Sequence, residues 1–398
     1  MIITLLVCVP AEGITDTSFV EAVNTARPNH RLITDSSVRN LLQRFKPTVY
    51  VDPAGYRPMA FYRDYLSHSV LKHDKRGIVE EAPDRNRLRN IKDHEGFYID
   101  YQIPAYKVRG ESSKPHTPTY YGRAYRDTTV VAGSPRPLLF LKYTAVFPYS
   151  GLPYEMNRLK CYGGSLLGNS YAWHELDIHG SVYVVLDAKR CVPLGIVLAQ
   201  HNYHRTLWRR HDFRWPETTR INISYASMSN EPYLLSKRKR TRTVRTVGNP
   251  RNLAWVYGRG PTPYLDAGYD RVLAPEDGAK SVGMKLRVLP ENDPLYTAEI
   301  PLGDKRKLFY FWSHWTREGP PGVNYYAPPR IVDLTNLTAF FDVEPSDETF
   351  WRLFDSGKSS LMEFPREELL KHQKQKMNRT LETLTSLNSP KPKSCPMF

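Results

Sequence analysis

Six polar side chains recur at alternate positions in two stretches near the middle of the chain. The first stretch supplies two carboxylates and an imidazole, and the second supplies an imidazole, a phenol and a guanidinium. They are Glu175, Asp177 and His179, followed by His201, Tyr203 and Arg205. Carboxylates and imidazoles are natural ligands of divalent cations, and imidazole and phenol groups can transfer protons at a reacting carbon. These residues are therefore the candidates for a functional site.

The residues between these polar positions predict the elements that hold them. Even positions from 174 to 187 are mostly apolar and odd positions mostly polar, the period of two that is typical of a strand with one buried face. A second apolar run, Leu194–Arg205, follows the short polar connection Ala188–Pro193. We therefore predict an antiparallel hairpin. Its predicted buried residues are Leu176, Val182, Val184, Ile196 and Leu198.

The pairing of the two strands follows from the position of the loop. With Asp187 opposite Pro193, the predicted pairs are Tyr183–Val197, His179–His201, Asp177–Tyr203 and Glu175–Arg205. Opposed Cβ atoms in such a pair lie about 5 Å apart, so the six polar side chains would form one cluster. A solvated face of an antiparallel sheet is the alternative explanation of the same pattern.

Two chemistries fit the predicted cluster. In the first, a divalent metal ion is held by His174, Glu175, Asp177, His179 and His201, because imidazole nitrogen and carboxylate oxygen are its ligands. The second needs no metal: His179 or His201 acts as base, Tyr203 as acid, and Arg205 neutralises a substrate carboxylate. No other cofactor is predicted.

The composition favours an all-β fold and an anionic partner. Across 398 residues the chain has 32 Pro, 23 Gly and 26 Tyr, and long helical periodicities are scarce, which favours many strands and loops. The net charge of +15 favours acidic glycans, lipid headgroups or nucleic acid as partners. The basic segment Ser236–Val247 interleaves Thr and Val with Arg, so an exposed edge strand or loop is favoured there over nucleic-acid binding.

Four cysteines are too few to build a disulfide scaffold, but Cys161 and Cys191 flank the central strand and could form a disulfide in a secreted protein. The start, MIITLLVCVPAEG, has a short apolar run with no basic residue before it. It is interpreted either as a weak or truncated signal peptide or as a buried first strand. A secreted or periplasmic location is expected, with a cytoplasmic one as the alternative, and no stretch is long enough to span a bilayer.

Four segments are predicted along the chain. Residues 1–45 form an N-terminal segment with a short helix around Ser36–Phe45, and residues 46–345 form a β-sandwich or jelly-roll domain. Within it, residues 67–95 are expected to form a charged loop or irregular helix. Residues 346–388 are predicted to be helical, and 389–398 form a flexible tail.

Several stretches resemble the β-sandwich superfamily of necrosis- and ethylene-inducing-peptide-like proteins and plant vacuolar-sorting-associated proteins. They are RFKPTVYVDPAGYRP, LKYTAVFPYSGLP, the central hairpin, SYASMSNEPYL and DETFWRLFDSG. In that family a His-x-x-Asp-x-Glu run helps to hold a divalent cation, and His174, Asp177 and His179 occupy its spacing here. The final acid of the run is replaced by His179, and Ser229-Asn230 stand where relatives often carry Ser-His. The resemblance implies a β-sandwich and a metal-dependent, toxin-like action on membranes.

A second resemblance is to jelly-roll polysaccharide lyases and glycosidases, which present His, Tyr and Arg on a concave sheet. A retaining glycosidase needs two carboxyl groups about 5–5.5 Å apart, and only Glu175 and Asp177 are available here, so a lyase is the better enzymatic interpretation. Three functions remain open. They are a protein that engages an acidic glycan or glycolipid headgroup, with a membrane surface as a further partner; a lyase of an acidic polysaccharide that acts by β-elimination; and a non-catalytic carbohydrate-binding module.

Overall fold

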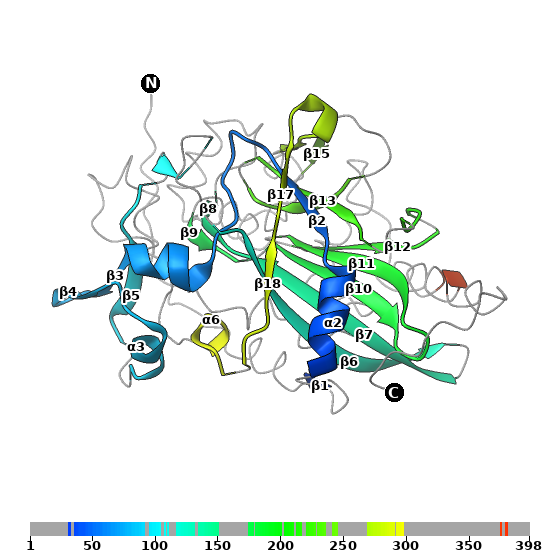
Figure 1. The fold of residues 1–398 in the computed structure, drawn as a ribbon, viewed down its shortest axis with the longest axis horizontal. Helices are drawn as coiled ribbons and strands as arrows, with labels where there is room; N and C mark the ends of the chain where they lie inside the picture. The colour runs from blue at the N-terminus through cyan, green and yellow to red at the C-terminus, as the bar shows by residue number, and fades with distance from the viewer. Residues whose placement is uncertain are drawn as a thin grey trace, which may run out of the picture.

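A computed structural model describes the central part of the chain (Figure 1). The described residues are 31–32, 36–91, 95–104, 107–108, 110, 117–131, 134–150, 174–178, 180–200, 203–210, 212–216, 220–227, 229–235, 241–245, 269–290, 292–297, 375 and 379–380. Strands make up 46% of this part and helices are few, which confirms the all-β prediction. The stacking of sheets into a sandwich or jelly roll stays a prediction.

A seven-stranded sheet organises the fold. Its order is β1 (Arg31–Leu32), β6 (Thr119–Val131), β7 (Ser134–Ala145), β10 (Ser181–Asp187), β11 (Val192–Gln200) and β12 (Tyr203–Trp208), with β18 (Lys285–Arg287) also pairing with β6. All these pairs are antiparallel except that of β18 with β6, which is parallel. The pairing of β10 with β11 confirms the predicted hairpin and its Tyr183–Val197 pair.

Helix α2 (Ser36–Phe45) packs on one face of this sheet, at the position that the sequence predicts for a helix. Its apolar residues Val38, Leu41, Leu42 and Phe45 are buried, as the helical spacing of an amphipathic segment requires. The hydroxyl of Tyr143 on β7 donates a hydrogen bond to the Leu42 carbonyl at 2.9 Å. This bond fixes the helix against the middle of the sheet.

Smaller sheets flank the central one. A four-stranded sheet has the order β14 (Pro232–Leu234), β13 (Asn222–Tyr225), β2 (Thr48–Val51) and β17 (Lys280–Val282). A three-stranded sheet has the order β4 (Gly77–Glu81), β3 (Ser69–His73) and β5 (Phe97–Tyr101). Two further sheets have two strands each: β8 (Phe147–Ser150) with β9 (His174–Asp177), and β15 (Arg242–Arg245) with β16 (Tyr269–Val272). Short helical turns are the π-helix Phe61–Tyr65, the 3-10 turns Leu66–His68 and Pro275–Asp277, and the α-helices α3 (Arg85–Arg89) and α6 (Pro294–Thr297).

The prediction for residues 67–95 is wrong, because this segment forms β3, β4 and α3. The strand β4 has little apolar periodicity, because it is an exposed edge strand, and the many charges of the segment are typical of a loop. The predicted helix over 346–388 lies outside the described residues except for Gln375, Arg379 and Thr380, which are helical. The tail 389–398 and the N-terminal apolar run also lie outside them. Within the described part, no helix is long and apolar enough to cross a membrane.

Truncation of core residues on the central hairpin should lower the free energy of unfolding. Val184 and Leu198 are fully buried on neighbouring strands, so truncation of either to Ala leaves a cavity. We expect each variant to lose on the order of 1–4 kcal/mol of unfolding free energy, measured by urea denaturation. Unchanged midpoints for both variants would contradict the close packing of this face.

Candidate functional site

The predicted polar cluster does not form as one sheet face. The first strand is interrupted between Asp177 and Ser181, and its first part, β9, leaves the central sheet to pair with β8. Glu175 is therefore opposite Tyr149, and not Arg205 as predicted. Asp177 is opposite Phe147, so its predicted pairing with Tyr203 is also wrong.

The second strand is interrupted as well. It turns back after Gln200, and β12 pairs with β11 itself, so that Tyr203 is opposite Gln200 and Arg205 is opposite Leu198. The chain reverses direction between Gln200 and Tyr203. Arg205 is therefore opposite the apolar, even-numbered Leu198. The predicted pairing of odd-numbered residues with odd-numbered residues is wrong at this position. The side chains of His174, His179, His201, Tyr203 and Arg205 lie outside the described side chains, as does the predicted His179–His201 pair. Their catalytic or metal-binding roles stay predictions.

Both faces of the β10–β11 hairpin are buried. The even-numbered residues predicted for the core are buried, including Leu176 on β9, which confirms that part of the prediction. Tyr183, Val185 and Val197, on the face predicted to be open, are fully buried too. A bulge between Val185 and Leu186 also places Asp187 opposite Val192 instead of Pro193. The alternating pattern therefore identified the strand but not the environment of its polar face.

Glu175 lies at the centre of a buried group of tyrosines. Its Oε1 atom accepts a hydrogen bond from the Tyr65 hydroxyl at 2.9 Å and another from the Tyr101 backbone N–H. The Tyr65 and Tyr101 rings stack with centroids 4.8 Å apart and planes at 16°. The π-helix, β5 and β9 thus meet at one carboxylate that is itself fully buried.

The phenols of Tyr101 and Tyr149 near Glu175 have raised pKa values and stay protonated. Burial is the first cause that raises the pKa of Tyr101, and the negative charges of Glu175 and Asp64 raise it further. Burial and then the charge of Glu175 raise the pKa of Tyr149 in the same way. The Tyr149 hydroxyl donates to the Ile103 carbonyl at 2.9 Å, whereas the buried Tyr101 hydroxyl has no hydrogen-bond partner among the described residues.

Asp177 is held by a different loop. The Asn230 side-chain amide donates to Asp177 Oδ2 at 2.9 Å and to the Tyr149 carbonyl at 2.7 Å. Asn230 has φ 55°, a left-handed conformation that Asn adopts more readily than most residues. One asparagine therefore links β8, β9 and the loop that joins β13 to β14.

Two glycines flank the same loop. A Cβ atom on Gly55 would lie 2.4 Å from the Ser227 carbonyl oxygen, and one on Gly180 would lie 2.8 Å from the Asn230 carbonyl oxygen. The Ser227 hydroxyl also donates a hydrogen bond to the buried Asp52 carboxylate. The segments that contain Asp52, Tyr149, Asp177 and Asn230, which carry the family resemblance, thus converge in one buried network, although they are far apart in the sequence.

The predicted metal site stays a prediction, because the side chains of His174, His179 and His201 lie outside the described side chains. Within the described residues, no three His, Cys, Asp or Glu side chains are grouped so that they could hold one. One oxygen of Glu175 accepts from Tyr65 and Tyr101, and one oxygen of Asp177 accepts from Asn230. These bonds hold the two carboxylates in place among the described residues.

A second candidate site is exposed and basic. Six basic side chains belong to α2, β18 and the segments that adjoin them, and we call this set the basic surface: Arg39, Arg44, Lys46, Arg220, Lys285 and Arg287. All are exposed except Lys46, which is half-buried. Neither Ser36–Phe45 nor Lys285–Arg287 contains an acidic residue.

Several contacts bring the parts of the basic surface together. Lys46 Nζ donates to the Met284 carbonyl, and Arg220 donates to the Gln43 carbonyl at 3.5 Å. Leu42 on α2 and Leu286 on β18 both lie against Gly122 of β6, and Figure 1 shows α2 and β18 side by side. Burial and then the positive charge of Arg220 lower the pKa of Lys46, so positive charge here is dense enough for one cation to disfavour another.

Local sequence patterns identify only part of these two sites. The helical pattern of α2 identifies its exposed arginines, but the contact with β18 joins positions more than two hundred residues apart. Tyr65 and Tyr101 are two among 26 tyrosines, and nothing local distinguishes them. Cys191 is in a disulfide, as the sequence allows, and its partner lies outside the described residues.

Comparison with protein-family models, with curated proteins and with solved structures finds no match for this chain.

Proposed function

We propose that the protein binds an acidic glycan or an anionic glycolipid headgroup through the basic surface. The observation that carries the proposal is the presence of six basic side chains on α2, β18 and the adjoining segments, which contact one another, with no acidic residue in either α2 or β18. Such a surface attracts polyanions over a distance of about 10 Å at ordinary salt. The net charge of +15 adds to this attraction at longer range.

The disulfide at Cys191 supports a secreted or periplasmic location, because disulfides persist in oxidising compartments. The buried network of Glu175, Asp177 and Asn230 has a structural role in this proposal: it holds together the sheets that frame the molecule. Binding is proposed ahead of β-elimination because the basic surface is described, whereas the side chains of the predicted lyase, His179, His201, Tyr203 and Arg205, lie outside the described side chains.

The test is titration calorimetry with a polyuronate and with a neutral glucan of similar length. We expect the native protein to bind the polyuronate only, and more weakly as salt is raised. The variant Arg39→Gln/Arg44→Gln/Lys285→Gln/Arg287→Gln should bind at least about tenfold more weakly. A control that removes four exposed charges outside the basic surface, Lys107→Gln/Lys189→Gln/Arg210→Gln/Arg214→Gln, should retain most of the affinity.

Three outcomes would contradict the proposal. They are equal binding of the two polymers, equal loss in the two variants, and a rise in ultraviolet absorbance from unsaturated uronate products. The last outcome would establish a lyase instead.

A further inference from the structure

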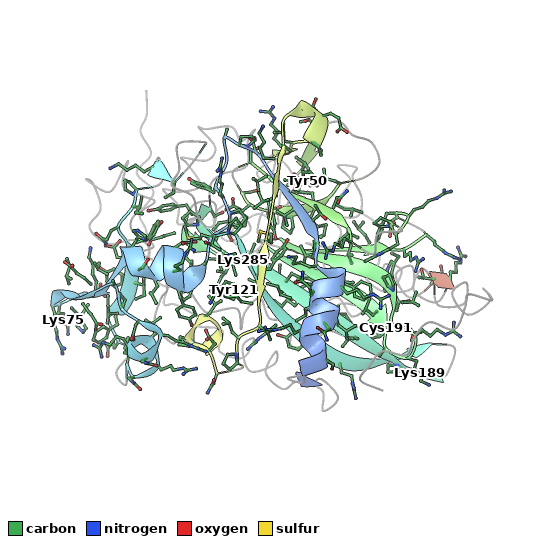
Figure 2. The ribbon with its side chains drawn as sticks, in the orientation of Figure 1. Tyr50, Lys75, Tyr121, Lys189, Cys191 and Lys285 are labelled. Carbon is green, nitrogen blue, oxygen red and sulfur yellow. The ribbon has the colours of Figure 1, made fainter. Side chains whose placement is uncertain are left out.

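The hairpin of β3 and β4 extends from the rest of the molecule. Its turn is closed by the Arg76 N–H, which donates to the His73 carbonyl at 3.1 Å, and Gly77 follows with φ 72°. Every residue from Asp74 to Val79 is exposed. Figure 1 shows β4 at one end of the molecule, and Figure 2 places Lys75 there, apart from Lys285 of the basic surface.

Two neighbouring aliphatic side chains are exposed on this hairpin. Ile78 is 57% and Val79 38% exposed, and they are the exposed large hydrophobic residues of the described part of the chain. In a regular strand, neighbouring side chains point to opposite faces. Here the register shifts between Leu71 and Lys72, so that Ile78 pairs with Lys72, Glu80 pairs with Leu71, and Val79 is the extra residue. The bulge allows both aliphatic side chains to face solvent.

The same bulge argues against another strand as the partner. A bulge on an edge strand, followed by charged residues, disfavours the addition of a further strand. Glu80 and Glu81 are those charged residues here. Two copies of the chain paired through β4 would bring these carboxylates together, so a second copy is a poor occupant of this surface.

The charges near the tip favour an anionic partner. Lys75 and Arg76 are exposed directly beside Ile78. Two neighbouring basic side chains have acidic partners: Lys72 on β3 pairs with Asp100, and Arg87 on α3 pairs with Glu80 at 2.8 Å. Asp74 is the one acidic residue of the turn, against two cations. A cationic tip with adjacent aliphatic side chains matches the interface of an anionic bilayer, where headgroups meet hydrocarbon.

We propose that the β3–β4 hairpin docks on anionic lipid bilayers, with Ile78 and Val79 entering the interface between the headgroups and Lys75 and Arg76 contacting lipid phosphates or carboxylates. This inference goes beyond the proposed glycan binding, because it uses different residues on a different part of the surface. Two aliphatic side chains and two cations give weak, reversible binding, as expected for a single docking element.

The test uses the full chain and vesicles of equal parts phosphatidylcholine and phosphatidylserine, with pure phosphatidylcholine vesicles for comparison. Co-sedimentation should show binding to the anionic vesicles only. Ile78→Ser/Val79→Ser should reduce the partition coefficient about tenfold or more, because it removes most of the apolar area that enters the interface. The conservative variant Ile78→Leu/Val79→Leu should restore binding to within about twofold.

A fluorescence measurement reports insertion separately from charge. In Ile78→Trp, tryptophan emission should shift to the blue when anionic vesicles are added, whereas Lys189→Trp, at another exposed turn, should not shift. The proposal is overturned if the Ser variant binds as well as the native protein, if the native protein does not bind anionic vesicles, or if sedimentation shows a dimer that the Ser variant loses. Polyuronate binding by the Ser variant should equal that of the native protein, so failure of this proposal is distinguishable from failure of the proposed function.

Discussion

Glu175→Ala should lower the free energy of unfolding by roughly 3–5 kcal/mol, more than other single truncations considered for this chain. The reason is that two buried donors depend on one carboxylate oxygen. The Tyr65 hydroxyl and the Tyr101 N–H both bond to Glu175 Oε1, and both tyrosines are fully buried. Each donor left without a partner costs about 1–3 kcal/mol, and the cavity left by the side chain adds to the loss.

The matched control is Glu175→Gln. Its amide oxygen can accept both hydrogen bonds at nearly the same position, so we expect this variant to lose about a third as much stability, on the order of 1–2 kcal/mol. Urea denaturation followed by tyrosine fluorescence and by circular dichroism would measure both variants. Equal stability of Glu175→Ala and the native protein would show that the Tyr65 and Tyr101 donors have other partners.

The sequence predicted elements better than it predicted how they meet. Helix α2 has the predicted bounds Ser36–Phe45, and the β10–β11 pair Tyr183–Val197 is as predicted. Both follow from local patterns, helical spacing in one case and alternation around a short loop in the other. Local patterns determine which residues share a face, but they contain no information about what covers that face.

The prediction that the six polar residues share one sheet face was wrong for a related reason. Alternation through residues 175–187 predicts one continuous strand. In the structure, β9 lies outside the central sheet, and the chain joins that sheet only at Ser181. Gly180 lies against the Asn230 carbonyl and the Tyr225 ring, so this close approach is set by the β13–β14 loop about fifty residues later. Leu176 also has φ 53°, a conformation that a regular strand does not contain. Neither feature has a local signal.

The resemblance implies a metal at segments that lie far apart in the sequence, and that metal stays a prediction. In the structure those segments meet through hydrogen bonds, and Asn230 donates where the resembling family often has histidine. An amide N–H that donates to a carboxylate satisfies a hydrogen-bond acceptor but does not neutralise the negative charge. A substitution at Asn230 distinguishes a structural network of this kind from a metal site.

Asn230→Asp should destabilise the protein by roughly 3–5 kcal/mol at neutral pH, although it changes only one atom type. The Asn230 amide donates to both Asp177 Oδ2 and the Tyr149 carbonyl. A carboxylate at this position turns both contacts into contacts between acceptors, and one of them joins two buried negative charges. Aspartate tolerates the left-handed backbone conformation as asparagine does, so the loss reports the side chain and not backbone strain.

The loss should shrink as the pH is lowered. Two carboxylates in contact raise the pKa of one of them above its unfolded value, because the pair cannot readily carry two charges. A group with a raised folded pKa contributes stability below its unfolded pKa and loses it as pH rises through the folded pKa. Urea midpoints of Asn230→Asp and the native protein should therefore converge between about pH 7 and pH 4. If added calcium or zinc instead rescued the variant at neutral pH, while a chelator destabilised the native protein, Asp177 would belong to a metal site and the hydrogen-bonded network would be secondary.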